Sequence, residues 1–403
     1  MTLDQITQLP NGARFHRCDL HIHSFGGSHD VSDATMSPDA IVETASAEGL
    51  SMIAVTDHNE IANVERAVDT GIKKGVVVVP GVELSTPEGH LLCYTPDIAA
   101  LKQLHGRLKF ADSGKANSRC NNSILDCLSH CHELGGLGIF AHVDGEKGYE
   151  REVPGAGPHK VDVICHPGLL GMELKNPQTD VSFSPEDSDA GRKNMGQQRI
   201  VRLGLGSRQF LARLVNSDAH TLASLGKNAQ GDRKITRIKM QEPSFAALKV
   251  ALEDADARVR IEDQIPAAVP HLLALHMAGG FPADQSIHLS PNLNCIIGGR
   301  GAGKSTTFEA VRCLSSNGGQ GYMVDKEVWP NVINFYWKDQ AGGCTSLMRP
   351  LGGTVENLDD PLAGPTSFEM PVLTSHLFLI LPATKSTLAA QSGRPLTGWL
   401  EAL

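Results

Sequence analysis

The sequence predicts an α/β fold in two parts, a β/α barrel over residues 1–265 and a smaller α/β domain over residues 266–403. Two observations predict it. In the first part, short apolar strand patterns alternate with helix patterns, and a histidine or acidic side chain follows most strands. In the second part, a strand pattern at residues 293–297 leads directly into a glycine-rich loop and a helix. Two prolines in residues 265–270 indicate a linker between the parts.

The first strand pattern covers residues 15–23 and contains two histidines separated by one residue. Side chains two positions apart point to the same face of a strand, so His21 and His23 can bind one metal ion without distorting the backbone. The glycine-rich loop that follows carries His29 and Asp30, which are two further potential ligands.

The alternation continues through the rest of the first part. A helix pattern capped by Ser37, with Pro38 at its first position, precedes a strand at residues 51–55 that ends in Asp57 and His58. Later strand patterns carry the remaining acidic and histidine groups, which are Glu83 and His90 after residues 75–79, His142 after residues 138–141, and Asp218 and His220 after residues 211–215. Functional side chains of a β/α barrel lie at the C-terminal ends of its strands, so we expect these groups to converge.

Taken in order, these groups resemble the motifs of the polymerase and histidinol phosphatase (PHP) family of metal-dependent phosphoesterases. The resemblance covers residues 15–260. Its motifs are Asp-x-His-x-His from Asp19 to His23, Thr-Asp-His from Thr56 to His58, Gly-x-Glu ending at Glu83 with His90 after it, the single His142, and Asp-x-His from Asp218 to His220. The resemblance implies a distorted seven-stranded β/α barrel that binds two or three divalent metals.

Metal-ligand roles follow from the same resemblance. It implies that His21, His23, Glu83 and Asp218 hold one metal, that Glu83 bridges to a second held by His90 and His142, and that His58 and His220 hold a third with an acid from the first loop. The family usually has Asp five residues after the second His, where this chain has Ser28, so His29 or Asp30 must replace it, and we prefer Asp30. Asp57, Glu83 and Asp218 are the candidate catalytic carboxylates. Mixed imidazole and carboxylate sites favour Zn²⁺, Mn²⁺ or Fe²⁺ over Mg²⁺.

The second part contains a P-loop motif, in which Gly298 and four further residues precede Gly303-Lys304-Ser305. In such a loop, backbone N–H groups and the helix N-terminus bind phosphates, the lysine meets the β and γ oxygens, and the serine helps to hold Mg²⁺. We therefore predict that ATP with Mg²⁺ binds here. The predicted contact residues are Gly298, Gly299, Arg300, Gly301, Ala302, Gly303, Lys304, Ser305 and Thr306.

The loop resembles the start of an SMC-like or ABC-like ATPase head, and the tandem resembles bacterial TrlF-like proteins that join a PHP domain to an ATPase. A Gln loop, a signature motif and an acidic Mg²⁺-binding strand are not recognisable, and residues 332–339 are the nearest candidate for the last. We therefore expect a partial P-loop NTPase lobe with impaired ATP hydrolysis. The charge-poor residues 370–403 suggest a truncated product that is out of frame there. A homodimer through this lobe is expected only if the lobe is complete.

Composition narrows the function class. The chain has 403 residues, 41% of them hydrophobic, a formal charge of −9 and nine cysteines at irregular spacing. No apolar segment is long enough to cross a bilayer, and the cysteine pattern favours a reducing compartment. We therefore expect a cytoplasmic protein without a membrane partner.

Charge is uneven along the chain. Residues 192–239 contain eleven lysines or arginines against two acids, which favours a phosphorylated or nucleic-acid substrate, although a solvated helix face would give the same count. The leading interpretation is a metal-dependent phosphoesterase that acts on nucleic-acid ends or nucleotides and is coupled to an ATP-binding module. One alternative is an ATP-dependent nucleic-acid-binding or switch protein with a structural metal site. Another is an amide or small phosphomonoester hydrolase.

Overall fold

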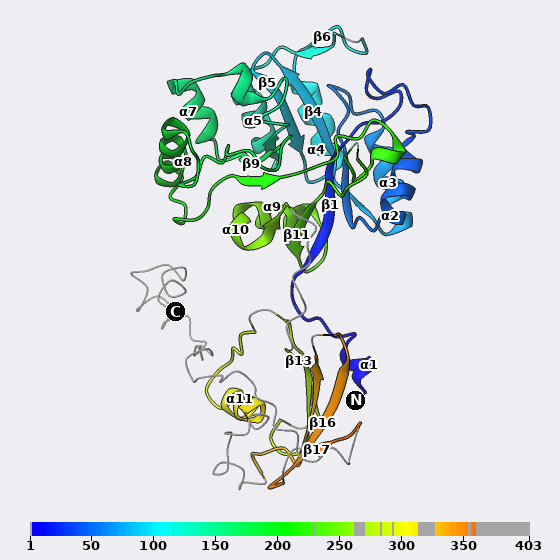
Figure 1. Ribbon diagram of the computed structural model, residues 1–403, viewed down its shortest axis with the longest axis vertical. Coiled ribbons are helices and arrows are strands. Elements are labelled where there is room, and N and C mark those ends of the chain that lie inside the picture. Colours follow the sequence, from blue (N-terminus) through cyan, green and yellow to red (C-terminus); the bar gives the residue numbers. More distant parts are fainter. Residues whose placement is uncertain are drawn as a thin grey trace. The chain divides into compact units, whose positions relative to one another are not determined.

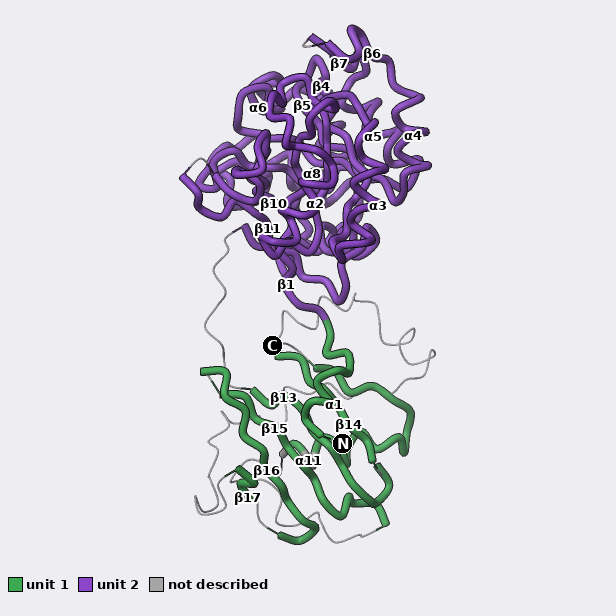
Figure 2. The backbone as a smooth tube through the Cα atoms, turned by 90° about the vertical axis from the view of Figure 1, so that its right-hand side faces the viewer, with its two compact units in different colours: residues 1–12, 265–403 green, residues 13–264 purple. Residues whose placement is uncertain are grey.

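In the computed structural model the chain separates into two compact units, Ala13–Gln264 and Met1–Gly12 with Ile265–Leu403 (Figure 2). The domain prediction made from the sequence stays a prediction. The structure describes residues 2–115, 117–228, 230–261, 271–282, 284–291, 294–312, 327–339, 341–353 and 356–359. The residues predicted to form the linker and the C-terminal tail 370–403 lie outside this set. No described helix is both long and apolar enough to cross a membrane.

Two five-stranded sheets form the centre of the unit 13–264, and both are mixed. The first has the order β12-β11-β1-β2-β3, with β1–β2 and β2–β3 parallel and the other pairs antiparallel. Its strands are β1 (Arg14–Ile22), β2 (Met52–Val55), β3 (Val77–Val78), β11 (Thr236–Met240) and β12 (Val259–Arg260). The sequence predicted strands at the positions of β1, β2 and β3.

The second sheet has the order β10-β9-β8-β5-β4. Its strands are β4 (Gly81–Thr86), β5 (Gly89–Tyr94), β8 (Leu137–Phe140), β9 (Leu169–Glu173) and β10 (Ala212–Leu214). Here β8–β9 and β9–β10 are parallel, whereas β4–β5 and β5–β8 are antiparallel. A short separate ladder joins β6 (Phe110–Ala111) to β7 (Arg119–Cys120). The fold is therefore α/β with mixed sheets, and the hairpin β4–β5 departs from the uniform strand-helix alternation expected from the sequence.

Isolated bridges connect the two sheets at the ends of their strands. Ile22 at the end of β1 pairs with Ala219 beyond β10, and His58 beyond β2 pairs with Glu83 in β4. Each bridge has backbone hydrogen bonds beside it, such as Asp218 N to His21 O at 3.0 Å and Asn59 N to Glu83 O at 2.8 Å. Segments far apart in the sequence are held side by side in this way.

Helices cover these sheets (Figure 1). They are α2 (Pro38–Ala47), α3 (Val64–Lys74), α4 (Ile98–Arg107), α5 (Ile124–Glu133), α6 (Tyr149–Glu152), α7 (Pro158–Ile164), α8 (Ala190–Leu203), α9 (Phe245–Glu253) and α10 (Ala255–Arg258), with a 3₁₀ turn at Leu222–Ser224. The sequence analysis did not predict α4, α6 or the start of α7.

Helix α2 shows how the local sequence produces these elements. The Ser37 hydroxyl accepts a hydrogen bond from Ala40 N, and Pro38 occupies the first turn, where its missing N–H costs nothing. The helix buries Ile41, Val42 and Ala45 against β2 and α3 in one hydrophobic cluster. This packing fixes the outer layer behind β1 and β2, the two strands that end at the histidine-rich segments.

The described residues of the other unit form an antiparallel sheet and one longer helix. The sheet order is β14-β13-β15-β16-β17, and every pair in it is antiparallel. Its elements are β13 (His271–Ala278), β14 (Gln285–His288), β15 (Val332–Lys338), β16 (Cys344–Pro350) and β17 (Glu356–Asn357), together with α1 (Leu3–Ile6) and α11 (Lys304–Arg312). The strand expected at residues 293–297 is not formed in its described part, because residues 294–297 have no ladder partner.

Candidate metal centre

The predicted ligands come from strands of both sheets and from the segments that follow them. His21 ends β1 and His23 follows it, His58 follows β2, Glu83 and His90 lie in β4 and β5, and His142, Asp218 and His220 follow β8 and β10. Asp30 comes from the loop after β1. The structure brings all nine of these side chains together, as the contacts below show.

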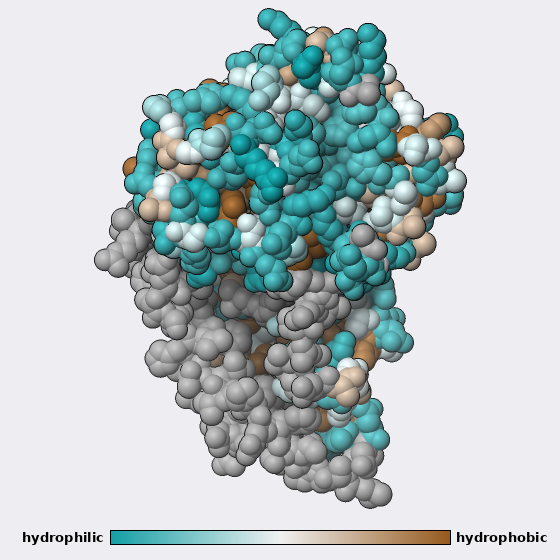
Figure 3. Space-filling model, turned by 45° about the horizontal axis from the view of Figure 1, so that its top comes forward, coloured by the Kyte–Doolittle hydropathy of each residue, from teal (hydrophilic) through white to brown (hydrophobic). Residues whose placement is uncertain are grey.

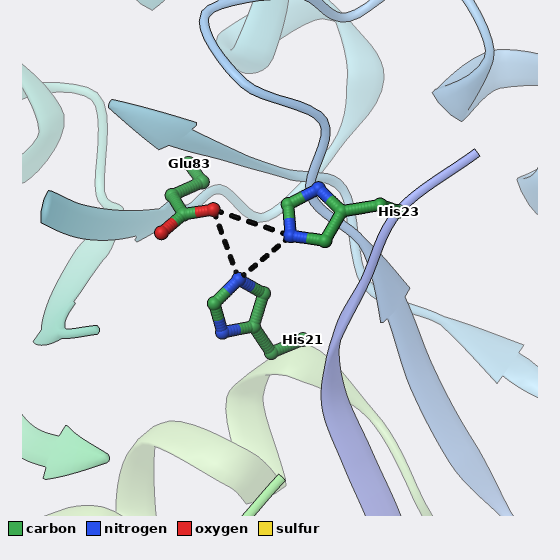
Figure 4. Close-up of side chains that lie close together, drawn as sticks. All are labelled: His21, His23 and Glu83. Carbon is green, nitrogen blue, oxygen red and sulfur yellow. Dashed lines mark hydrogen bonds and ion pairs between the residues drawn. The ribbon is translucent and has the colours of Figure 1, made fainter. Parts of the chain in front are cut away.

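The first group consists of His21, His23, Glu83 and Asp218. The Nε2 atoms of His21 and His23 lie 3.1 Å apart and 3.0 and 3.3 Å from Oε2 of Glu83 (Figure 4). Asp218 Oδ1 lies 3.7 Å from the first of these nitrogens and 3.3 Å from the second. His21, His23 and Glu83 are completely buried.

The second group meets the same carboxylate. Glu83 Oε1 lies 2.8 Å from Nδ1 of His90 and 3.3 Å from Nε2 of His142, and Oε2 lies 3.2 Å from Nδ1 of His58. Glu83 is therefore shared between two sets of imidazoles. This is the arrangement expected of a carboxylate that bridges two cations.

Asp30 forms the third group. Its Oδ2 lies 3.0 Å from Nε2 of His220 and 3.3 Å from Nε2 of His58, and His23 is close enough to complete the group. Both partners of the closest pair are about one third exposed, with side-chain values of 36% for Asp30 and 34% for His220. The side of the centre formed by this group is thus open to solvent.

The tautomers of the histidines fit cation binding. Nδ1 of His21 lies 2.7 Å from a carboxylate oxygen of Glu173 and Nδ1 of His220 lies 2.9 Å from the carbonyl of Asp218, and both of these partners can only accept. Nδ1 of His23 lies 2.8 Å from the Ser28 hydroxyl, which also accepts from His58 N at 3.0 Å. The Nε2 atom of each of these three rings faces a carboxylate oxygen, an arrangement that a divalent cation bound between them would satisfy.

Electrostatics point the same way. Burial by itself would raise the pKa of the Glu83 carboxyl, but His58, His21 and His90 hold it well below its usual range. Burial would lower the pKa of His23, but Asp218 and Glu83 raise it to about 9. The carboxylates thus stabilise positive charge at this point, whether a proton or a metal ion carries it.

Glu173 was missed by the sequence interpretation. It ends β9, is completely buried, accepts from His21 and lies 3.4 Å from Nδ2 of Asn216, while its Oε1 has no hydrogen-bond partner. The signal was present, because an acid that ends an apolar strand is the same pattern that selected the other ligands. Asn216 Oδ1 also accepts from Leu20 N at 2.9 Å, so Asn216 connects Glu173 to the backbone of β1.

Two acids of the motifs lie outside the three groups. The Asp57 carboxylate accepts from Ser24 N at 2.6 Å and from the Ser24 hydroxyl at 2.5 Å, and burial raises its pKa to about 6. Asp19 accepts from Ser217 N at 3.0 Å, from the Ser217 hydroxyl at 2.5 Å and from Gly226 N at 3.0 Å. These contacts of Asp57 hold the loop after β1, and its catalytic role stays a prediction.

Ser28 stands where the resembled family usually has an aspartate. It belongs to none of the three ligand groups. Its hydroxyl contacts His23 Nδ1 and accepts from His58 N at 3.0 Å, so it orients two of the histidines. His29 is exposed and its ring centroid lies 5.4 Å from that of His58. Of the two replacements considered, Asp30 is the one that approaches His220 and His58.

Backbone strain is concentrated here. His142 has φ +28° and Asp218 has φ +56°, although both carry Cβ atoms that disfavour the left-handed region. Asn59, next to His58, has φ +56° and accepts from Ser85 N through its side chain. Such conformations persist where the surrounding structure holds them, which is common at functional sites.

Several basic side chains of the stretch 192–239 have partners within the fold. Arg199 is buried and donates to the carbonyls of Ile164, His166 and Leu169. Others pair with acids distant in sequence, among them Arg202 with Asp162, Arg208 with Asp256, and Lys227 and Arg233 with Glu48. The face of unit 13–264 turned to the viewer in Figure 3 is largely hydrophilic.

The predicted nucleotide-binding residues 298–306 are all described. The loop is followed by α11, which begins at Lys304, and Gly301 and Gly303 have φ +80° and +81°. Lys304 Nζ donates to the carbonyls of Gly298 and Gly299 at 2.9 and 2.7 Å. The loop and helix are present, but a P-loop NTPase fold around them is not established.

Known proteins resemble parts of this chain. Residues 19–144 match the family model of the PHP domain. A 5'-3' exoribonuclease of Haemophilus influenzae is 37% identical over 68 residues, which span 17% of this chain and 23% of that protein. The solved lesion-specific endonuclease PfuEndoQ of Pyrococcus furiosus is 17% identical with a TM-score of 0.45, and the match covers 66% of this chain and 62% of the endonuclease.

A putative metal-dependent phosphoesterase of Bifidobacterium adolescentis has 16% identity and a TM-score of 0.37, with 58% of this chain and 95% of that chain covered. The chain thus spans less than two thirds of the exoribonuclease and of the endonuclease. The match to the family model covers seven of the nine gathered side chains, from His21 to His142. Residues 19–144 of this chain are therefore similar to the PHP domain.

Proposed function

We propose that this protein is a metal-dependent phosphoesterase that hydrolyses phosphoester bonds of nucleic-acid ends or nucleotides. The observation that carries the proposal is the sharing of Glu83, whose Oε2 lies 3.0 Å from His21 Nε2 while its Oε1 lies 2.8 Å from His90 Nδ1. A carboxylate shared in this way is suited to two adjacent cations, and paired cations serve phosphoryl transfer by stabilising the attacking and leaving oxygens.

The chain's own groups have separate tasks in this mechanism. His21, His23, Glu83 and Asp218 would hold one cation, His90 and His142 with Glu83 a second, and His58, His220 and Asp30 a third. Bound Zn²⁺, Mn²⁺ or Fe²⁺ would supply activation of water and neutralisation of phosphoryl charge. In the reaction one water adds across a P–O bond, phosphorus gains its oxygen, and the leaving oxygen takes up a proton. Glu173 holds His21 so that its Nε2 faces the centre.

A structural metal site is the main alternative. Structural sites are saturated by about four protein ligands, whereas catalytic sites keep a position open. Nine side chains in three overlapping groups, with Asp30 and His220 partly exposed, favour an open centre. The names of the similar proteins, an exoribonuclease and an endonuclease, support nucleic acid as the substrate class.

The decisive experiment combines metal analysis of the purified protein with a hydrolysis screen. The substrates are p-nitrophenyl phosphate, nucleoside bisphosphates, and single-stranded DNA and RNA. The variant His21→Ala with His23→Ala should lose both metal and hydrolysis. The double variant His132→Ala with His166→Ala, a ring pair 5.8 Å apart outside the centre, is the control for loss of two histidines. Full metal content and full hydrolysis in the first variant would refute the proposal.

We also propose that residues 298–306 bind ATP with Mg²⁺. The contacts of Lys304 with the Gly298 and Gly299 carbonyls support this, because they place the ammonium inside the loop where phosphate oxygens would compete for it. Lys304→Ala should abolish binding of a fluorescent ATP analogue, with Lys338→Ala as a control from the same unit. Equal affinity in the two variants would exclude the P-loop assignment. Dimerisation through this lobe remains part of the proposal and is measured by light scattering with and without ATP.

A further inference from the structure

We propose that the mouth of the metal centre holds the terminal nucleotide of a single nucleic-acid strand, with Lys175 binding its phosphate and Phe25 stacking on its base. The inference rests on the proposed function and deepens it by naming the form of the substrate. It depends on two side chains that the sequence interpretation did not select.

Lys175 lies at the solvent side of the first ligand group. Its Nζ is 3.4 Å from Oδ2 of Asp218, and the side chains of the two residues are 56% and 16% exposed. Among the described residues, this is the one ion pair between a lysine or arginine and a predicted metal ligand. A cation bound to Asp218 would neutralise the carboxylate charge that now attracts Lys175. The Lys175 ammonium could then bind a phosphoryl oxygen.

The backbone at Lys175 is held in place. Asp144 accepts from Lys175 N at 2.6 Å through Oδ1 and from Asn176 N at 3.1 Å through Oδ2. Asp144 itself lies two residues after the predicted ligand His142, so the same short segment fixes a ligand and the start of the lysine side chain. An anchored backbone reduces the conformational freedom that the lysine would lose when it binds a phosphate.

Phe25 stands on the loop that carries Asp30, two residues after His23. It is 45% exposed and is the single aromatic side chain classed as exposed among the described residues of unit 13–264. Its backbone is fixed at both polar atoms, because Phe25 N donates to Met36 O at 2.9 Å and Asn63 Nδ2 donates to Phe25 O at 3.0 Å. An exposed aromatic side chain on an anchored backbone, two residues from a proposed metal ligand, is suited to stacking on a nucleobase.

The pair restricts the class of substrate. A base inside a duplex is already stacked and paired, whereas a base at a single-stranded end offers its face to an aromatic ring. Lys175 recognises a phosphate of any substrate, but Phe25 recognises only one that carries a base. We therefore infer a preference for single-stranded ends over duplex ends and over phosphomonoesters without a base.

The test measures binding of fluorescent 12-nucleotide single strands to the metal-loaded full chain, with and without the base on the terminal nucleotide. In the wild type, removal of that base should weaken binding roughly tenfold, and Phe25→Ala should weaken binding of the intact strand by a similar factor. In Phe25→Ala, removal of the base should have no further effect. Ile72→Ala, which truncates an apolar side chain that is 78% exposed on α3, is the control. Equal effects of base removal in the wild type and in Phe25→Ala would overturn the stacking.

Lys175 is tested by salt dependence. Lys175→Gln should reduce the slope of log Kd against log salt by about 0.7, the value for one phosphate contact on a single strand. Lys175→Arg should restore the slope. Lys102→Gln is a matched control, because Lys102 is 58% exposed and pairs with Glu65 at 2.7 Å away from the predicted ligands. An unchanged slope in Lys175→Gln would overturn this contact.

The two levels of the proposal fail differently. Hydrolysis without any coupling between Phe25 and the terminal base would overturn the inference and leave the proposed function intact. Coupled binding without hydrolysis of any substrate would overturn the proposed function and leave the nucleotide site intact.

Discussion

Nδ1 of His21 lies 2.7 Å from Oε2 of Glu173, a completely buried carboxylate at the end of β9. The contact fixes the proton on Nδ1 and directs Nε2 toward Glu83 and His23. Hydrogen-bond partners of this kind orient a ligating imidazole and raise its basicity.

We therefore predict that Glu173→Ala lowers metal affinity about 10- to 100-fold, the usual effect of removing such a partner. Competition with a chromophoric chelator measures the affinity. Glu173→Gln should recover most of the loss, because its amide oxygen can still accept from Nδ1. Glu133→Ala, at an exposed ion pair with Arg107, controls for loss of a carboxylate. Equal affinity in Glu173→Ala and the control would show that the contact does not position His21.

Replacement of the shared carboxylate should affect more than one cation. In Glu83→Gln, both oxygens that now face imidazoles lose their negative charge, so the metal content should fall by more than one ion per chain. Mass spectrometry of the metals measures the stoichiometry. Asp218→Asn, at a carboxylate that belongs to the first group alone, should lose no more than one ion. A loss of a single ion in both variants would contradict bridging by Glu83.

A substitution of Asp57 distinguishes a structural role of this residue from a catalytic one. Its carboxylate accepts from the Ser24 backbone and hydroxyl inside the protein, so Asp57→Asn should reduce the free energy of unfolding by about 1–3 kcal/mol. Metal content per folded molecule should remain near that of the wild type. Thermal denaturation and metal analysis measure the two quantities. If the stability were unchanged and only kcat fell, the catalytic assignment made from the sequence would be favoured.

Much of the centre could be predicted because its ligands obey a local rule. His21, His58, His142 and Asp218 each occur at or near the C-terminal end of an apolar strand pattern, and parallel strands bring such ends together. Glu83 and His90 do not obey this rule, since they lie within the strands of an antiparallel hairpin. The sequence analysis selected both residues as ligands, but it did not predict the hairpin that carries them.

The remaining features depended on contacts that no local pattern contains. The basic stretch 192–239 looked like a free positive surface, yet Arg202 and Lys227 find their acids 40 and 179 residues away in the sequence. Glu173 ends an apolar strand as the other acids do, but its contact with His21 depends on the ring orientation of that histidine, which no local pattern gives. The strand expected at residues 293–297 was inferred from apolar content alone, and such content does not supply a ladder partner.

Metal removal should destabilise one unit selectively. The proposed metal ligands come together only in the folded unit, so bound cations should stabilise it relative to the unfolded chain. Ligand linkage at a free metal concentration 100 times Kd contributes about 2.7 kcal/mol per site. A chelator should therefore lower the unfolding temperature of unit 13–264 by several degrees in differential scanning calorimetry, and added Zn²⁺ or Mn²⁺ should restore it. The variant His21→Ala with His23→Ala should respond much less to the chelator. An equal shift in the variant and the wild type would mean that the chelator acts elsewhere, because only the wild type retains the first group of ligands.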